Sequence, residues 1–231
     1  MVLMSQSTVR AIVTDIEGTT TDINFVHNVL FPYAYAKLPD FLCENAEAPA
    51  VAEQLDAVRR DMQDPEATLE AVIAKLLHWI DTDQKVTPLK ALQGMVWADG
   101  YQRGDFTGHL YVDVAPALRQ WQAEGKALYV YSSGSVQAQK LLFGYSDEGD
   151  LTPLFSGYFD THIGHKREAA AYQRIVEALD LPAESVLFLS DVVEELDAAQ
   201  QAGMQTLQLV REGTQAGTRH PCVTRFDEIH L

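Results

Sequence analysis

The sequence has little cysteine and no long apolar run. Only Cys43 and Cys222 occur in 231 residues, which is too few for a disulfide framework, and their separation is not that of a zinc site. No stretch approaches the roughly 20 apolar residues that a membrane helix needs, and Met1–Met4 is too short for the apolar region of a signal peptide. We therefore expect two free thiols, a cytoplasmic location and no membrane association.

Basic residues are also scarce. Lysine and arginine total 17 against 33 acidic residues, so the formal net charge is −16. A chain this acidic does not bind nucleic acid through its overall field. An anionic ligand would need a few local cations, a bound metal ion or backbone N–H groups. The sequence shows no repeat and no long exposed apolar seam, and we expect a monomer acting on a small molecule.

What the chain has in quantity is apolar residues, 47% of the total, arranged in two different patterns. Short apolar strands at 9–15, 127–131, 185–190 and 206–210 alternate with helical patterns at 114–124, 136–143, 166–179 and after Asp191, and 157–163 could form another short strand. Alternation of this kind predicts right-handed βαβ units. We expect an α/β fold with a doubly wound parallel sheet.

The segment from about 49 to 101 has a helical pattern only. Val51, Leu55, Val58 and Met62 recur at helical spacing, and the same pattern continues to residue 96. Pro65 and Pro88 stand where new helices could start, whereas Pro32 interrupts the helical pattern of 24–38. We predict a catalytic core of residues 1–21 and 114–231, with an all-helical cap inserted at 22–113.

Polar side chains follow several of the predicted strands. The carboxyl ends of parallel strands share one edge of a sheet, which is where ligands bind, so polar groups distant in sequence can converge there. The candidates are Asp15 and Glu17 after the first strand, Ser132 and Ser133, Lys166, and Asp191 with Glu195.

These residue types suit phosphoryl transfer. Asp15 and Asp191 are hard oxygen ligands of the kind that Mg²⁺ takes together with waters and a phosphate, and Asp15 could also attack phosphorus. Glu17 could serve as general acid and then base. Ser132, Ser133 and Lys166 offer hydroxyl, backbone and ammonium donors to phosphate oxygens.

Each candidate also has an ordinary structural interpretation. Asp15 and Glu17 could be turn carboxylates, and the serine cluster could cap the helix that follows it. Lys166 could be a solvated surface lysine, and Asp191 could cap the next helix.

The ordered motifs resemble those of the haloacid dehalogenase superfamily. They are Asp15-Ile-Glu17-Gly18-Thr19, Ser133, Lys166 and Asp191-Val-Val-Glu-Glu195. The longer segments Leu30-Phe-Pro-Tyr33, Leu92-Gln-Gly94, Gln139-Lys-Leu-Leu-Phe-Gly144 and Gly164-His-Lys166 resemble the enolase-phosphatases of methionine salvage within that superfamily. The match extends from about Ala11 to Arg211.

The resemblance implies roles for these positions. Asp15 would be the nucleophile and a Mg²⁺ ligand, Glu17 a catalytic and metal-associated residue, and Asp191 the residue that completes the metal site. Ser132, Ser133 and Lys166 would bind the substrate phosphate. Glu17 stands where the wider superfamily usually has Asp, so its role as a simple general acid stays open.

The resemblance also implies a particular reaction, and two alternative functions stay open. A 2,3-diketo-5-methylthiopentyl-1-phosphate would be enolised and then dephosphorylated to the acireductone. The enolisation base is not identified by spacing; Lys90 and the Ser132/Ser133 pair are candidates. One alternative is a phosphatase of the same superfamily acting on another small phosphate ester, and another is a non-catalytic ligand-binding protein on the same fold.

Overall fold

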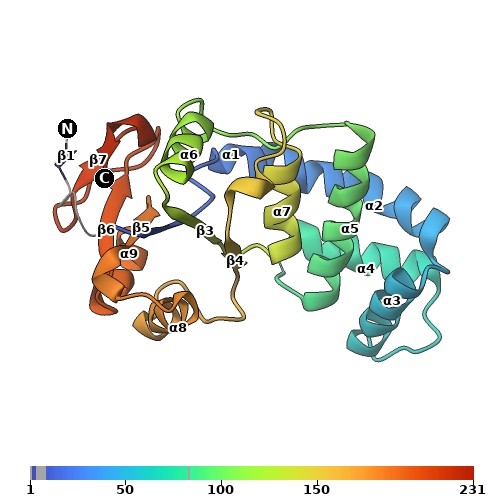
Figure 1. Cartoon of the computed structure of the whole chain (residues 1–231). Coiled ribbons are helices and arrows are strands. Elements are labelled where there is room, and N and C mark those ends of the chain that lie inside the picture. The colour runs from blue at the N-terminus through green and yellow to red at the C-terminus, as the bar shows by residue number, and fades with distance from the viewer. Residues whose placement is uncertain (1, 4–8, 83) are drawn as a thin grey trace. The chain divides into compact units, whose positions relative to one another are not determined.

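The chain folds into two units (Figure 1). The structure, a computed structural model, describes residues 2–3, 9–82 and 84–231, so Met1 and Met4 lie outside it. One unit comprises Met1–Ile23 and Thr107–Leu231, and the other comprises Asn24–Phe106. The sequence instead predicted domain boundaries between residues 21 and 22 and between residues 113 and 114.

The first unit contains a six-stranded parallel sheet in the order β4-β3-β2-β5-β6-β7. Its strands are β2 (Ala11–Thr14), β3 (Ala127–Tyr131), β4 (Gly157–Phe159), β5 (Val186–Ser190), β6 (Gln205–Leu209) and β7 (Cys222–Val223). The prediction of a doubly wound parallel sheet is confirmed. The prediction that 206–210 is the last strand is wrong, because β7 follows it and β8 (Ile229–His230) pairs with β1 (Val2–Leu3). Strands of two residues carry no periodicity that a sequence pattern could reveal.

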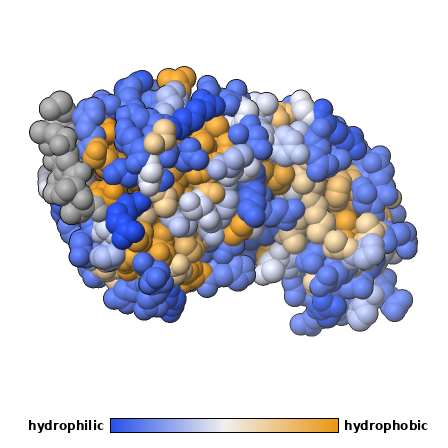
Figure 2. Space-filling view, viewed as in Figure 1, coloured by the Kyte–Doolittle hydropathy of each residue, from blue (hydrophilic) through white to orange (hydrophobic). Residues whose placement is uncertain are grey.

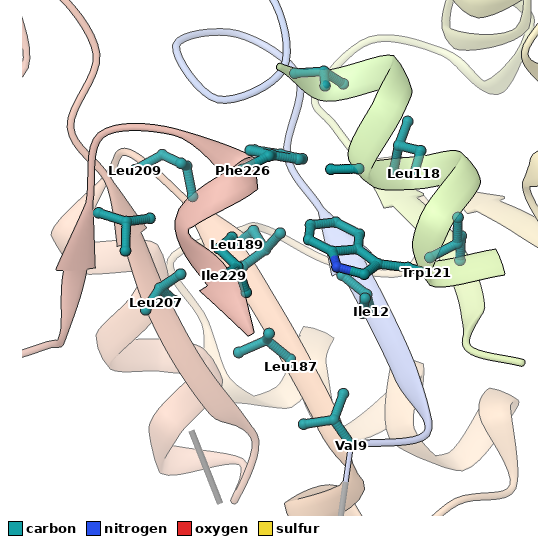
Figure 3. Packing of buried hydrophobic residues seen from close by; sticks show 14 residues of the cluster. Val9, Ile12, Leu118, Trp121, Leu187, Leu189, Leu207, Leu209, Phe226 and Ile229 are labelled. Carbon is teal, nitrogen blue, oxygen red and sulfur yellow. The ribbon is translucent and has the colours of Figure 1, made fainter. Parts of the chain in front are cut away.

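Both faces of this sheet are covered. In β2, Ile12 packs into one apolar cluster while Ala11 and Val13 pack into another, as expected when side chains alternate along a strand buried on both faces. The first cluster includes Leu118 and Trp121 of α6 (Val114–Ala123) (Figure 3). The second is covered by α8 (Ala169–Leu179) and α9 (Val193–Gln201).

The remaining helices of this unit are short or begin near strand ends. They are α7 (Val136–Gly144) and the 3₁₀ turns η2 (Thr152–Leu154), η3 (Ala183–Ser185) and η4 (Phe226–Glu228). Helix α8 begins at Ala169, so the prediction of a helix from Lys166 is wrong by three residues. Lys166 lies in the turn before it, which is what allows this lysine to reach the sheet edge.

The second unit is helical, as its periodicity predicts. It consists of α1 (Ile23–Phe25), the π-helical turn η1 (Val26–Leu30), α2 (Phe31–Asn45), α3 (Pro49–Asp61), α4 (Leu69–Asp81) and α5 (Thr87–Arg103). Apolar residues spaced by four and three, such as Val72, Leu76 and Trp79, form its core. Pro32 does not end the helix: residues 23–45 are helical without a break, and Pro32 lies where the π-helical turn η1 passes into α2. Pro88 is the second residue of α5, whereas α4 starts at Leu69, capped by the Thr68 hydroxyl.

Hydrophilic residues predominate on the surface shown in Figure 2, in keeping with the large net charge. Cys43 and Cys222 are free thiols. Over the ranges that the structure describes, no helix has the length and apolar character of a membrane span.

Candidate active site

Asp15 lies at the centre of the carboxyl edge of the sheet. Its backbone N–H continues the ladder beyond β2 by donating to the carbonyl of Leu189 in β5, at 2.9 Å. The chain first proceeds outward from β2 through β3 and β4, and then returns to β5 on the other side of β2. The β2–β5 pair is therefore the topological switch point, where open α/β sheets bind ligands. Asp15 is 2% exposed there.

A tight turn carries the chain away from Asp15. The carbonyl of Ile16 accepts hydrogen bonds from the N–H groups of Thr19, Thr20 and Thr21, at 2.9–3.1 Å. Gly18 has φ +77°, and a Cβ there would lie 2.4 Å from Oδ2 of Asp191. Glycine is thus required for two reasons: the left-handed backbone and the close approach of the Asp191 carboxylate.

Thr19 joins this turn to the end of β5. Its hydroxyl accepts a hydrogen bond from the Asp191 N–H at 3.0 Å and lies 3.5 Å from Oδ1 of the same residue. Thr19 is fully buried. The two acidic strand ends, Asp15 and Asp191, are therefore linked through the turn to which Thr19 belongs.

Lys166 is buried against carboxylates. Its Nζ pairs with Oδ1 of Asp15 and, at 2.7 Å, with Oε2 of Glu195 in α9. The lysine is 7% exposed, so the interpretation of Lys166 as a solvated surface residue is wrong. Ser190 donates to the same Glu195 oxygen at 3.0 Å.

Two buried tyrosines hold the turn that carries Lys166. Tyr172 of α8 donates its hydroxyl proton to the Lys166 carbonyl at 2.7 Å, and Tyr131 at the end of β3 donates to the carbonyl of Gly164 at 2.9 Å. Gly164 has φ +140°, and a Cβ there would lie 2.8 Å from that of Ala171. The sequence does not predict these two contacts, since nothing in a periodic pattern shows where a hydroxyl points.

The carboxylates outnumber the cation at this edge. Burial and the Asp15 charge raise the pKa of Asp191 to about 6, and the same two causes raise the pKa of Glu195 to about 7. Burial alone would lower the pKa of Lys166, but the charges of Asp15 and Glu195 raise it above its usual value. Lys166 therefore stays positively charged, and its single charge balances only one of the three carboxylates Asp15, Asp191 and Glu195.

This donor set fits a magnesium ion. Asp15 and Asp191 are two hard oxygen donors with a surplus of negative charge, and Mg²⁺ takes one or two carboxylates together with waters and substrate oxygens. The described residues contain no cluster of three or more His, Cys, Asp or Glu side chains arranged to hold a metal by themselves. An all-protein cage is not what magnesium requires, and the backbone at Gly18 approaches the Asp191 carboxylate closely.

The serine cluster follows β3, the strand next to β2. Ser132 is buried; its N–H donates to the Phe159 carbonyl at 3.2 Å and its hydroxyl accepts from the Gly134 N–H at 3.1 Å. Ser133 is exposed. The cap of α7 is Ser135, whose hydroxyl accepts from the N–H of Ala138 at 3.2 Å. The capping interpretation is therefore right for Ser135 and does not account for Ser132 or Ser133.

Gln139 stabilises this turn, and the sequence did not single it out for that. Its amide donates to the carbonyls of Gly134 and Phe159, both at 2.8 Å, while the side chain is 1% exposed. Of the other candidates, Glu17 is partly exposed in the Asp15 turn and Lys90 is exposed on α5. Asp191 caps no helix, because α9 begins after Val192 without a side-chain cap.

Comparison with known proteins agrees with this geometry. The family model of the haloacid dehalogenase-like hydrolases matches residues 9–203. "Enolase-phosphatase E1" of Erwinia tasmaniensis is 63% identical over 96% of this chain and 97% of its own length. The chain belongs to the enolase-phosphatase E1 family of haloacid dehalogenase-like hydrolases.

Other relatives of this enolase-phosphatase family member are similar over the same length. "Enolase-phosphatase E1" of Pseudomonas aeruginosa is 60% identical over 96% of this chain and 98% of its own. Among solved structures, the UTR4 protein of Saccharomyces cerevisiae has a TM-score of 0.82 at 33% identity, covering 96% of this chain and all of that one. A haloacid dehalogenase-like phosphatase of Thermococcus onnurineus, with a TM-score of 0.59 at 16% identity, shares the fold.

Proposed function

We propose that this protein is a Mg²⁺-dependent enolase-phosphatase of methionine salvage. It converts 2,3-diketo-5-methylthiopentyl-1-phosphate into the acireductone 1,2-dihydroxy-3-keto-5-methylthiopentene and phosphate. The observation that carries this proposal is the buried Asp15 at the switch point, paired with Lys166 and facing a second acidic strand end at Asp191. The E1 relatives, one of them 63% identical, support the choice of substrate.

Asp15 acts as the nucleophile in the second half of the reaction. One carboxylate oxygen forms a bond to phosphorus as the bond between phosphorus and the enol oxygen breaks, which leaves an aspartyl-phosphate. Water then attacks phosphorus and releases the Asp15 carboxylate and inorganic phosphate. Glu17 protonates the departing oxygen and later takes the proton of that water. An enolate needs less help from an acid than an alkoxide does, which suits a Glu at a position where the wider superfamily has Asp.

Lys166, Ser132 and Ser133 bind the phosphate. Lys166 is a fixed positive charge 2.7 Å from Glu195 and in contact with Asp15, so it also keeps the Asp15 carboxylate oriented. Ser132 and Ser133 present hydroxyl groups at the end of the strand beside β2. Positioning and charge stabilisation of this kind account for most of the catalysis in phosphoryl transfer.

Asp15, Asp191 and Glu17 hold the magnesium ion, Glu17 through its carbonyl or its carboxylate. When bound, the ion offsets the surplus negative charge and stabilises the transferring phosphoryl group. We also propose that the helical unit acts as a cap that excludes water during enolisation and selects the substrate, that Lys90 or the Ser132/Ser133 pair supplies the base, and that the enzyme is a cytoplasmic monomer.

Direct assay of the diketo phosphate tests this proposal. With Mg²⁺ we expect a transient enol-phosphate absorbance followed by release of phosphate, and neither signal after chelation. Release of phosphate without the transient would favour another phosphatase of the same superfamily. No turnover of this substrate or of any small phosphate ester would favour a ligand-binding protein.

A further inference from the structure

Arg211 lies two residues after β6 and is almost completely buried, with 5% of its side chain exposed. The guanidinium donates to both carboxylate oxygens of Asp113, at 2.8 and 3.0 Å. It also donates to two backbone carbonyls, those of Thr224 at 3.0 Å and Thr19 at 3.1 Å. A buried charge with this many partners is costly to form and costly to disrupt, which suggests a role beyond filling space.

The hydrogen bond to Thr19 connects Arg211 to the Ile16–Thr21 turn that follows Asp15, here called the catalytic turn. Arg211 Nε donates to the carbonyl of Thr19, and the hydroxyl of the same threonine receives the Asp191 N–H. Thr19 is thus held at two atoms: its carbonyl oxygen accepts from Arg211, and its hydroxyl oxygen accepts from the Asp191 N–H. A displacement of Thr19 would move the Asp191 backbone and the glycine that packs against its carboxylate.

The surroundings of Arg211 leave it little freedom. The guanidinium lies 4.2 Å from the centre of the Tyr111 ring and 5.5 Å from that of Phe226. The Tyr111 N–H donates to the carbonyl of Thr20 at 3.0 Å, so Tyr111 itself is bound to the catalytic turn. Asp113 accepts a further bond from the Phe226 N–H at 2.7 Å. The orientation of Arg211 is therefore determined before any ligand arrives.

We propose that Arg211 is a positioning residue for the magnesium site, acting through Thr19 on Asp191. The inference rests on the proposed function, because it concerns the affinity of that site for Mg²⁺. Arginine is needed because its planar fork places two N–H groups on one carboxylate while Nε reaches a third acceptor. A lysine ammonium could keep the charge opposite Asp113 but could not hold Asp113 and the Thr19 carbonyl in the same geometry.

The test is Mg²⁺ titration of the full-length, metal-stripped protein by calorimetry, for Arg211→Lys and Arg211→Met. Both variants should bind Mg²⁺ roughly 10- to 100-fold more weakly than the wild type, which is the usual effect of losing a partner that orients a metal ligand. With substrate, kcat should fall at low Mg²⁺ and recover as Mg²⁺ is raised, while KM stays nearly unchanged. A merely structural role would lower stability but leave the Mg²⁺ affinity of the folded protein unchanged.

Arg225→Lys is the matched control. Arg225 makes a similar paired contact with Asp227, with N–O distances of 2.7 to 3.2 Å, but both residues are exposed. This variant should bind Mg²⁺ like the wild type. If Arg211→Lys is folded and also binds Mg²⁺ like the wild type, the inference is wrong. Failure of the wild type itself to bind Mg²⁺ would instead contradict the proposed function.

A measurement on the unaltered protein covers the case in which both Arg211 variants fail to fold. In ¹⁵N-arginine-labelled protein, the Arg211 Nε–H resonance should shift on addition of MgCl₂, whereas that of Arg225 should stay in place. An Arg211 resonance that does not respond while Mg²⁺ binds would overturn the inference.

Discussion

Replacing Lys166 by methionine tests the electrostatic arrangement of the site. Methionine keeps much of the length and apolar stem of lysine and removes the ammonium. Lys166 is 7% exposed and pairs with Asp15 and Glu195, so the change leaves carboxylates buried without a counter-charge. Removing one partner of a buried ion pair costs about 3–5 kcal/mol of unfolding free energy, whereas losing an exposed pair costs about 0–1 kcal/mol.

The loss should depend on pH in a definite direction. The folded-state pKa of Glu195 is already raised to about 7 and that of Asp191 to about 6, and removal of Lys166 raises both further. A carboxyl whose pKa is raised on folding binds more protons in the folded than in the unfolded state, so stability falls as pH rises above its unfolded value. The loss of unfolding free energy caused by Lys166→Met should therefore be larger at pH 8 than at pH 5.

The assay is urea unfolding in the presence of a chelator, followed by Trp121 fluorescence. Trp121 belongs to the α/β core, and Trp79 and Trp97 of the helical unit are replaced by Phe in both proteins so that only the first unit is observed. Arg103→Met, which removes an exposed ion pair with Asp99, is the control and should have no effect on this transition. A deficit for Lys166→Met below about 1 kcal/mol at pH 8, or one that grows toward pH 5, would refute the reasoning.

Two further predictions concern the turn and its support. Gly18→Ala should abolish most phosphate release, because its Cβ would meet the Asp191 carboxylate. Gly149 also has a positive φ but has no neighbour within 4 Å, so Gly149→Ala should lose only stability, about 1–2 kcal/mol. Equal phosphate release by the two variants would contradict this prediction. Burial would raise the pKa of Asp113, but hydrogen bonds from Arg211 and from the Phe226 N–H lower that pKa below its usual 3.8. The contribution of Asp113 to stability is therefore present above about pH 3.8 and is lost as pH falls through the lower folded-state pKa. The melting temperature of Asp113→Asn should accordingly lie below that of the wild type at pH 7 and approach it below about pH 4; a constant difference would count against the assignment.

The sequence was a good guide wherever a residue's role depends on its position along a regular element. The apolar strands before Asp15 and Asp191 predicted that these two residues lie near each other, because parallel strands end at one edge of the sheet. The helical periodicity of 49–101 likewise predicted the core of the second unit. These are local patterns that the chain displays in order.

Other features depend on contacts between distant segments and left no such pattern. The two-residue strands β7 and β8 are too short to show alternation, and Lys166 lies before α8 because its turn is fixed by Tyr172 and Tyr131. Arg211 is a buried cation paired with a residue 98 positions away. Nothing in its immediate sequence distinguishes it from a surface arginine.

Single-turnover phosphate release from the diketo phosphate by Asp15→Asn, beside the wild type, tests the central claim most directly. If Asp15 is the nucleophile, the variant should remain folded, bind Mg²⁺ more weakly than the wild type, and release no phosphate when Mg²⁺ is saturating. Phosphate release by Asp15→Asn at the wild-type rate would contradict the account.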